Sequence, residues 1–179
     1  MHTFPEVDVE EFENLLETEE FNRQLEKLPN VSKRTLVEEK DLGGGKRHTV
    51  VRYEARAVPE QVKKWLGDES IGWTEEMDFN RNTHFHKFRI IPTRMKDRVN
   101  CEGSYKIEPL SPDGGARRIV TLNVKVKMLG LGSIAERAAK PFLDANAREE
   151  ERLAKEYIRD HPPEKKGKSG EKKGKKTGK

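Results

Sequence analysis

Residues 130–160 read GLGSIAERAAKPFLDANAREEERLAKEYIRD and carry the only long helical pattern in the chain. Apolar residues recur there at spacings of about three, four or seven, which places them along one side of a helix. These residues are Ile134, Ala138, Phe142, Ala145, Leu153 and Tyr157. The other side is rich in Glu and Arg, so we expect a long amphipathic helix that needs a large apolar partner.

The ends of this helix have recognisable signals. Ser133 is a natural N-cap, and Glu136, three residues later, would complete a capping box. Pro162-Pro163 should end the helix. Pro141 lies inside the pattern and removes one backbone hydrogen bond, so we expect a bend or break near Arg137 or a helix that begins again at Pro141.

Upstream of the helix, the apolar pattern changes to a period of two, which is typical of strands with one buried face. Gly-rich turns at 42–45 and 111–115 separate some of these strands, and short connections favour an antiparallel sheet. The predicted strands are Val31–Asp41, Lys46–Ala57, Ile71–Arg81, Thr83–Thr93, Val99–Pro109 and Arg117–Met128. The fold class is therefore α+β, with the long helix lying across the dry face of a curved sheet of about six to seven strands.

The N-terminal segment predicts a short edge strand at His2–Pro5 and two short helices. Asp8 can cap the first helix, with Glu11 as its capping-box partner, and Thr18 can cap the second. A further helical turn is expected at Pro59–Gly67.

The composition of the chain limits the classes of protein to which it can belong. The chain has 179 residues, 32% of them hydrophobic and 38% charged, which favours one domain at 1–160 with a modest core. Cys101 is the only cysteine, so it cannot form an internal disulfide. We find no secretory signal and no apolar run long enough to span a membrane, and we therefore expect a cytoplasmic protein.

The last segment, 161–179, is a Lys-rich tail that we expect to be disordered because it has almost nothing apolar to bury. It holds a net charge of +6, against +4 for the whole chain, so the rest of the chain is slightly acidic. The composition of the tail favours a solubilising role, and weak electrostatic contact with nucleic acid or an anionic membrane is the alternative.

The element order resembles the helix-grip fold of the START-like superfamily, which includes the birch-pollen allergen, polyketide cyclases/dehydrases and lipid-transfer proteins. The features that carry the resemblance are the opening strand with paired helices up to Leu28-Pro29, the Gly43–Gly45 hairpin, the Pro59–Trp65 segment, the Pro112–Gly115 turn and the glycines Gly130 and Gly132. The chain is also similar to a bacterial family of unknown function within this superfamily. Members share a fold and a cavity rather than a catalytic signature, so no catalytic residue is implied.

The resemblance implies a space between sheet and helix that holds a hydrophobic ligand such as a lipid, a sterol or a polyketide. Strand parity predicts the residues of the sheet that line this space, and the helix would add Phe142, with Leu153 beside it. The predicted sheet residues are Tyr53, Trp73, Met77, Phe79, Phe88, Tyr105, Leu122, Val124 and Val126. A filled core is the equal alternative, because the hydrophobic content is low.

Three polar residues are weak catalytic candidates. His84 and His86 should point the same way from one strand, as an acid/base pair or, with Glu75 or Cys101, as part of a metal site. Glu75, among aromatic residues, could be a general base with a raised pKa, or could lie solvated near a strand end. Two ordinary polar residues are the better interpretation of the His-x-His pattern, and a buried small residue that of Cys101, so we expect no metal and no cofactor.

Three functions stay open. The first, which we favour, is non-catalytic binding or transport of a small hydrophobic ligand. The second is an enzyme of the cyclase/dehydrase kind, and the third is a partner-binding domain that acts through its basic tail.

Overall fold

The computed structural model describes residues 1–56, 72–94, 96–127 and 132–162. The predictions for Pro59–Gly67, Met128 and most of the Lys-rich tail fall outside these residues. The helices are α1 (Val9–Glu17), α2 (Glu19–Gln24), the 3₁₀ turn η1 (Leu25–Lys27) and α4 (Gly132–Asp160). The strands are β1 (His2–Phe4), β2 (Val31–Gly43), β3 (Lys46–Ala55), β4 (Gly72–Asn80), β5 (Phe85–Pro92), β6 (Val99–Ser111) and β7 (Gly114–Val126).

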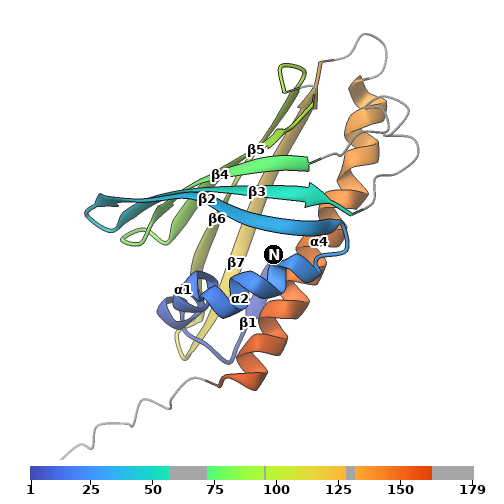
Figure 1. Cartoon of the computed structure of the whole chain (residues 1–179). Helices are drawn as coiled ribbons and strands as arrows, with labels where there is room; N and C mark the ends of the chain where they lie inside the picture. The colour runs from blue at the N-terminus through green and yellow to red at the C-terminus, as the bar shows by residue number, and fades with distance from the viewer. Residues whose placement is uncertain (57–71, 95, 128–131, 163–179) are drawn as a thin grey trace, which may run out of the picture.

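The strands form one seven-stranded antiparallel sheet in the order β1-β7-β6-β5-β4-β3-β2. Figure 1 shows the sheet curving, with α1 and α2 near β1 and β7 and with α4 running past them. The α+β helix-grip architecture is therefore confirmed. Since consecutive strands pair from β2 to β7, the period-two pattern of the sequence translates directly into one inner and one outer face.

The hydrophobic core lies where β1, α1 and α2 meet the C-terminal turns of α4. Phe4 and Phe12 stack at 4.1 Å between ring centroids, and Phe21 meets Tyr157 edge-on at 5.8 Å. Leu153 is 1% exposed and belongs to this cluster. Burying a side chain of this size contributes about 2–3 kcal/mol, so this end of the molecule supplies much of the packing energy.

The N-terminal helix signals are confirmed in atomic detail. The backbone N–H of Glu11 donates to the Asp8 carboxylate at 2.9 Å, and the N–H of Asp8 donates to the Glu11 carboxylate at 2.8 Å. The N–H of Phe21 donates to the Thr18 hydroxyl at 3.2 Å. Both short helices begin at the predicted caps because these side chains satisfy otherwise free backbone donors.

Two predictions for the long helix are wrong. The helix begins at Gly132, so Ser133 lies within it rather than before it, and the Glu136 carboxylate accepts a hydrogen bond from Val126 N–H at 2.9 Å. Pro141 lies inside one continuous helix, so the chain neither breaks near Arg137 nor restarts at the proline, and a bend near Arg137 stays a prediction. Glu136 instead links α4 to the end of β7.

Within the described residues, no helix is both long enough and apolar enough to cross a membrane.

Gly103, in β6, is required for close packing of the sheet. A Cβ atom there would lie 2.4 Å from the carbonyl oxygen of Thr121 and 2.6 Å from Cζ of Phe88. We expect Gly103→Ala to lower the free energy of unfolding by about 1–3 kcal/mol, because the backbone of β7 has to shift. Urea denaturation measures this loss. The neighbouring Ser104→Ala is the control, and equal stability of the two variants would contradict the close approach.

Candidate functional site

A cavity of about 950 Å³ lies between the inner face of the sheet, the N-terminal helices and the middle of α4. The inner side chains of β3 to β7 form one wall, Leu16 and Phe21 close it from α1 and α2, and Leu143 and Ala147 close it from α4. Among the described side chains of α4, those of its C-terminal turns pack into the core, while Leu143 and Ala147 face the cavity. A cavity of this volume favours the open interpretation over the filled core.

The strand parity that we read from the sequence places most of the predicted wall correctly. Eight of the predicted residues line the cavity: Tyr53, Trp73, Met77, Phe79, Phe88, Tyr105, Leu122 and Val124. Val126 does not, because it ends β7 where the chain approaches α4. Leu153 is in the core instead, and the side chain of Phe142 lies outside the described residues.

A row of five stacked side chains, which we call the His86 ladder, crosses one end of the cavity. Each member comes from a different strand, from β3 to β7 in order. Arg47 Cζ lies 5.7 Å from the ring centroid of Phe79, and the Phe79 ring lies 4.2 Å from that of His86. His86 stacks on Tyr105 at 4.0 Å, and Arg118 Cζ lies 5.4 Å from the Tyr105 ring. Guanidinium groups thus cap a three-ring stack at both ends.

His86, at the centre of the ladder, is held in its neutral form. Its side chain is buried, and neither ring nitrogen has a hydrogen-bond partner among the described residues. Burial lowers the pKa of His86 to about 3, and the positive charges of Arg118 and Arg47 act in the same direction. A group with this pKa exchanges protons poorly near neutral pH, so His86 is a weak candidate for acid/base chemistry.

His84 does not share the cavity with His86. It precedes β5 and has a φ of 52°, in the left-handed region, so strand alternation does not apply to it. Its Nδ1 lies 2.9 Å from Oε1 of Glu13, a carboxylate that is buried on α1. The predicted pair of parallel imidazoles is therefore wrong, because the strand begins one residue too late.

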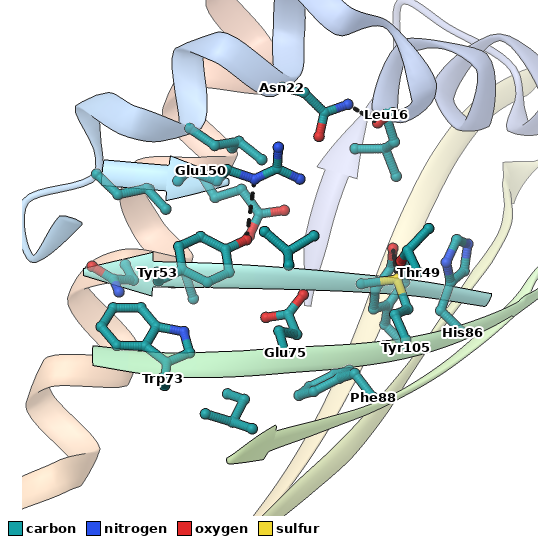
Figure 2. A pocket seen from close by; sticks show the side chains of 18 of the residues that line it. Leu16, Asn22, Thr49, Tyr53, Trp73, Glu75, His86, Phe88, Tyr105 and Glu150 are labelled. Carbon is teal, nitrogen blue, oxygen red and sulfur yellow. Dashed lines mark hydrogen bonds between the residues drawn. The ribbon is translucent and has the colours of Figure 1, made fainter. Parts of the chain in front are cut away.

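Glu75 projects into the middle of the cavity from β4, as Figure 2 shows, between Tyr53 and Trp73 on one side and Tyr105 and His86 on the other. Burial raises the pKa of Glu75 to about 7, and the Glu150 carboxylate acts in the same direction, while Arg34 opposes the shift. The alternative of a solvated strand end is wrong, since Glu75 is the fourth residue of a nine-residue strand.

Two polar pairs in the cavity were not predicted. Arg34 Nε donates to the hydroxyl oxygen of Tyr53 at 3.3 Å, drawn as a dashed line in Figure 2. Arg118, which is 4% exposed, donates to Glu150 of α4 at 2.5 Å. Arg118 has the same parity as the inward-facing β7 residues, so the sequence pattern could have predicted that it faces the cavity. A charged residue at an inward position was not taken as part of the site.

Cys101 faces inward, as predicted, and lines the cavity. Burial raises the pKa of its thiol to about 11, so it is a poor nucleophile at neutral pH. In the described ranges, no three His, Cys, Asp or Glu side chains are grouped so that they could hold a metal ion. The site is therefore an apolar cavity with a few convergent polar groups, which is typical of small-molecule sites.

Comparisons with known proteins agree with this architecture. The crystal structure of TTHA0849 from Thermus thermophilus superposes with a TM-score of 0.63 at 16% identity, over 90% of this chain and 95% of that one. The Zhui aromatase/cyclase from Streptomyces sp. R1128 gives a TM-score of 0.62 at 15% identity, over 89% and 90% of the two chains. At these identities the likeness shows the fold alone, a START-like helix-grip fold.

No curated protein matches the sequence. A family model matches residues 1–158, which is nearly all of the part predicted to fold. The chain therefore belongs to the family described as "Protein of unknown function (DUF2505)".

Proposed function

We propose that this protein binds a small hydrophobic ligand, such as a lipid or a polyketide-like molecule, in the cavity between the sheet and α4. The observation that carries the proposal is the cavity itself, with its volume of about 950 Å³ and its wall of mainly apolar and aromatic side chains. Sites for small molecules commonly have volumes of about 300–1,000 Å³ and such linings. The fold that the chain shares with an aromatase/cyclase is compatible with this role.

The exposure of apolar side chains on the wall supports the same proposal. Leu36, Val120 and Leu122 line the cavity, yet they are 51%, 37% and 39% exposed. Large apolar side chains that face inward without being covered leave an unfavourable contact with water, which an apolar ligand would remove. The hydrophobic effect would therefore favour binding of an apolar ligand that covers these side chains.

Filling the cavity tests the proposal. Val124→Trp places a large ring on the inner face of β7 and should abolish binding of any ligand that co-purifies with the protein. Lys125→Trp, one residue later on the outer face, is the matched control and should bind as the wild type does. Native mass spectrometry of the three proteins measures the bound mass. Retention of the ligand by Val124→Trp would place binding elsewhere.

A second candidate is catalysis of the cyclase/dehydrase kind, with Glu75 as a general base. The observation that favours it is the pKa of about 7, which suits proton transfer near neutral pH. If the co-purifying molecule is chemically altered by the wild-type protein, Glu75→Gln should slow that change by about 100-fold or more. A rate unaffected by Glu75→Gln would exclude this role.

A further inference from the structure

Apolar side chains surround the part of the Glu75 side chain that lies next to the backbone. Val51 of β3 and Ile90 of β5 lie directly opposite it across the two strand pairs, and Trp73 and Met77 flank it on the same face of β4. All four line the cavity. Neighbours directly opposite are within side-chain contact, so they exclude water from the root of the Glu75 side chain.

The carboxyl group of Glu75 forms no hydrogen bond or ion pair with any residue that the structure describes. It reaches past these apolar neighbours into the cavity, as seen in Figure 2. Leaving a polar group among apolar side chains without a partner is unfavourable. A molecule in the cavity that offers a hydrogen bond to this carboxyl would recover that energy, whereas a purely apolar molecule would not.

The charged groups around Glu75 balance one another when Glu75 is ionised. The charged groups that act on it are Glu150 and Arg34, and Glu150 is itself bonded to Arg118. Two guanidinium groups thus accompany two carboxyl groups on this part of the wall. An ammonium or carboxylate group on the ligand would leave an excess charge in an apolar space, at a high desolvation cost.

A hydroxyl group suits this position better than a carbonyl group. It can donate to the ionised carboxylate and can accept from the protonated acid. Since the pKa of Glu75 is about 7, both forms are present near neutral pH. A carbonyl group could pair with only the protonated form.

We propose that Glu75 is the specificity-determining residue of the cavity and selects an uncharged, largely apolar ligand whose hydroxyl group hydrogen-bonds to the Glu75 carboxyl. This inference rests on the proposed ligand-binding function and names the chemical class that the cavity takes. In this arrangement the hydroxyl belongs to an apolar ligand that lies between the stacked rings of Tyr53 and Trp73 on one side and the His86 ladder on the other.

A matched series of fluorescent probes tests the inference: pyrene, 1-pyrenemethanol, 1-pyrenecarboxylate and 1-pyrenemethylammonium. The four share one apolar body and differ only in the group offered to Glu75. Affinities are measured by fluorescence titration at pH 6 and pH 8 for the wild type, Glu75→Gln and Glu75→Leu. Glu76→Gln, on the outer face of the same strand and paired with Arg89 at 2.6 Å, is the control variant.

We expect 1-pyrenemethanol to bind the wild type most tightly at both pH values. Glu75→Gln, which can still donate and accept, should keep this affinity within about threefold, and Glu75→Leu should lower it about tenfold. Pyrene itself should bind Glu75→Leu at least as tightly as it binds the wild type. Glu76→Gln should match the wild type for every probe.

Other outcomes would overturn the inference. Tightest binding of the ammonium probe, lost in Glu75→Gln, would show a site for cations, and tightest binding of the carboxylate probe would show a site for anions. Equal binding of 1-pyrenemethanol to Glu75→Leu and the wild type would remove Glu75 as a specificity residue while leaving the proposed function intact. Failure of all four probes, pyrene included, would count against the proposed function as well.

Discussion

Lowering the pH from 7 to about 4.5 should destabilise the protein by about 2.5 kcal/mol through His86 alone. The folded-state pKa of about 3 lies below the ordinary value of 6.5, so the unfolded chain binds a proton that the folded chain does not. The contribution of neutral His86 to the free energy of unfolding is therefore fully present above about pH 6.5. It is lost as the pH falls towards 3, at up to about 1.4 kcal/mol per pH unit.

The variant His86→Phe isolates this contribution. A phenyl ring can keep the stack with Phe79 and Tyr105 and removes two buried nitrogens that have no described partner. Urea unfolding at pH 7, 5.5 and 4.5 should give a shallower loss of stability for the variant. NMR titration of the wild type should show a His86 imidazole that stays neutral down to about pH 4. Parallel stability curves for the two proteins would contradict the buried neutral histidine.

Breaking the Arg118–Glu150 pair should have an effect of similar or greater size. Glu150→Leu would leave the guanidinium of Arg118, only 4% exposed, without its carboxylate partner. Removing one member of a buried pair costs about 3–5 kcal/mol, so we expect a loss in this range by chemical denaturation at pH 7. His2 Nδ1, at 3.5 Å from the guanidinium, cannot replace the lost negative charge, because an imidazole is either neutral or positively charged.

The double variant Arg118→Met/Glu150→Leu separates charge from packing. Replacing both charges by apolar side chains of similar size is often close to neutral, so the double variant should recover most of the stability lost in Glu150→Leu. Glu149→Leu, next to Glu150 and paired with the exposed Arg152, is the control and should cost less than about 1 kcal/mol. Additive losses in the double variant would mean that the two side chains act independently.

The period-two pattern predicted the sheet well because each strand has one inner face along its whole length. In β7, the alternation from Val120 to Val124 gave the face that lines the cavity. The same parity includes Arg118, which is 4% exposed and which the sequence analysis did not name. Its burial depends on Glu150, which lies 32 residues later on α4, and periodicity cannot show such a distant pairing.

The least predictable parts were those where local backbone geometry overrides the pattern. His84 has the parity of His86, but its positive φ turns it towards Glu13 of α1. Ser133 has the sequence of a cap, yet the helix begins one residue earlier. The His86 ladder follows from the strand register, which places Phe79 opposite His86 and His86 opposite Tyr105, and a sequence without fixed registers does not contain it.

The open cavity also could not be predicted from composition. A low hydrophobic content is compatible with a small filled core or with a thin apolar wall around a space. Among the described side chains of α4, those in the C-terminal turns join Phe4 and Phe21 in the core, whereas Leu143 and Ala147 in its middle line the cavity. The domain assignment of 1–160 with a separate tail stays a prediction.

The central claim is that the cavity holds a small hydrophobic molecule, and native mass spectrometry of the full-length protein as purified tests it most directly. We predict an additional mass of a few hundred daltons that is released by organic solvent and is absent from Val124→Trp. A wild-type protein that carries no additional mass and also fails to bind any added pyrene probe would contradict the claim.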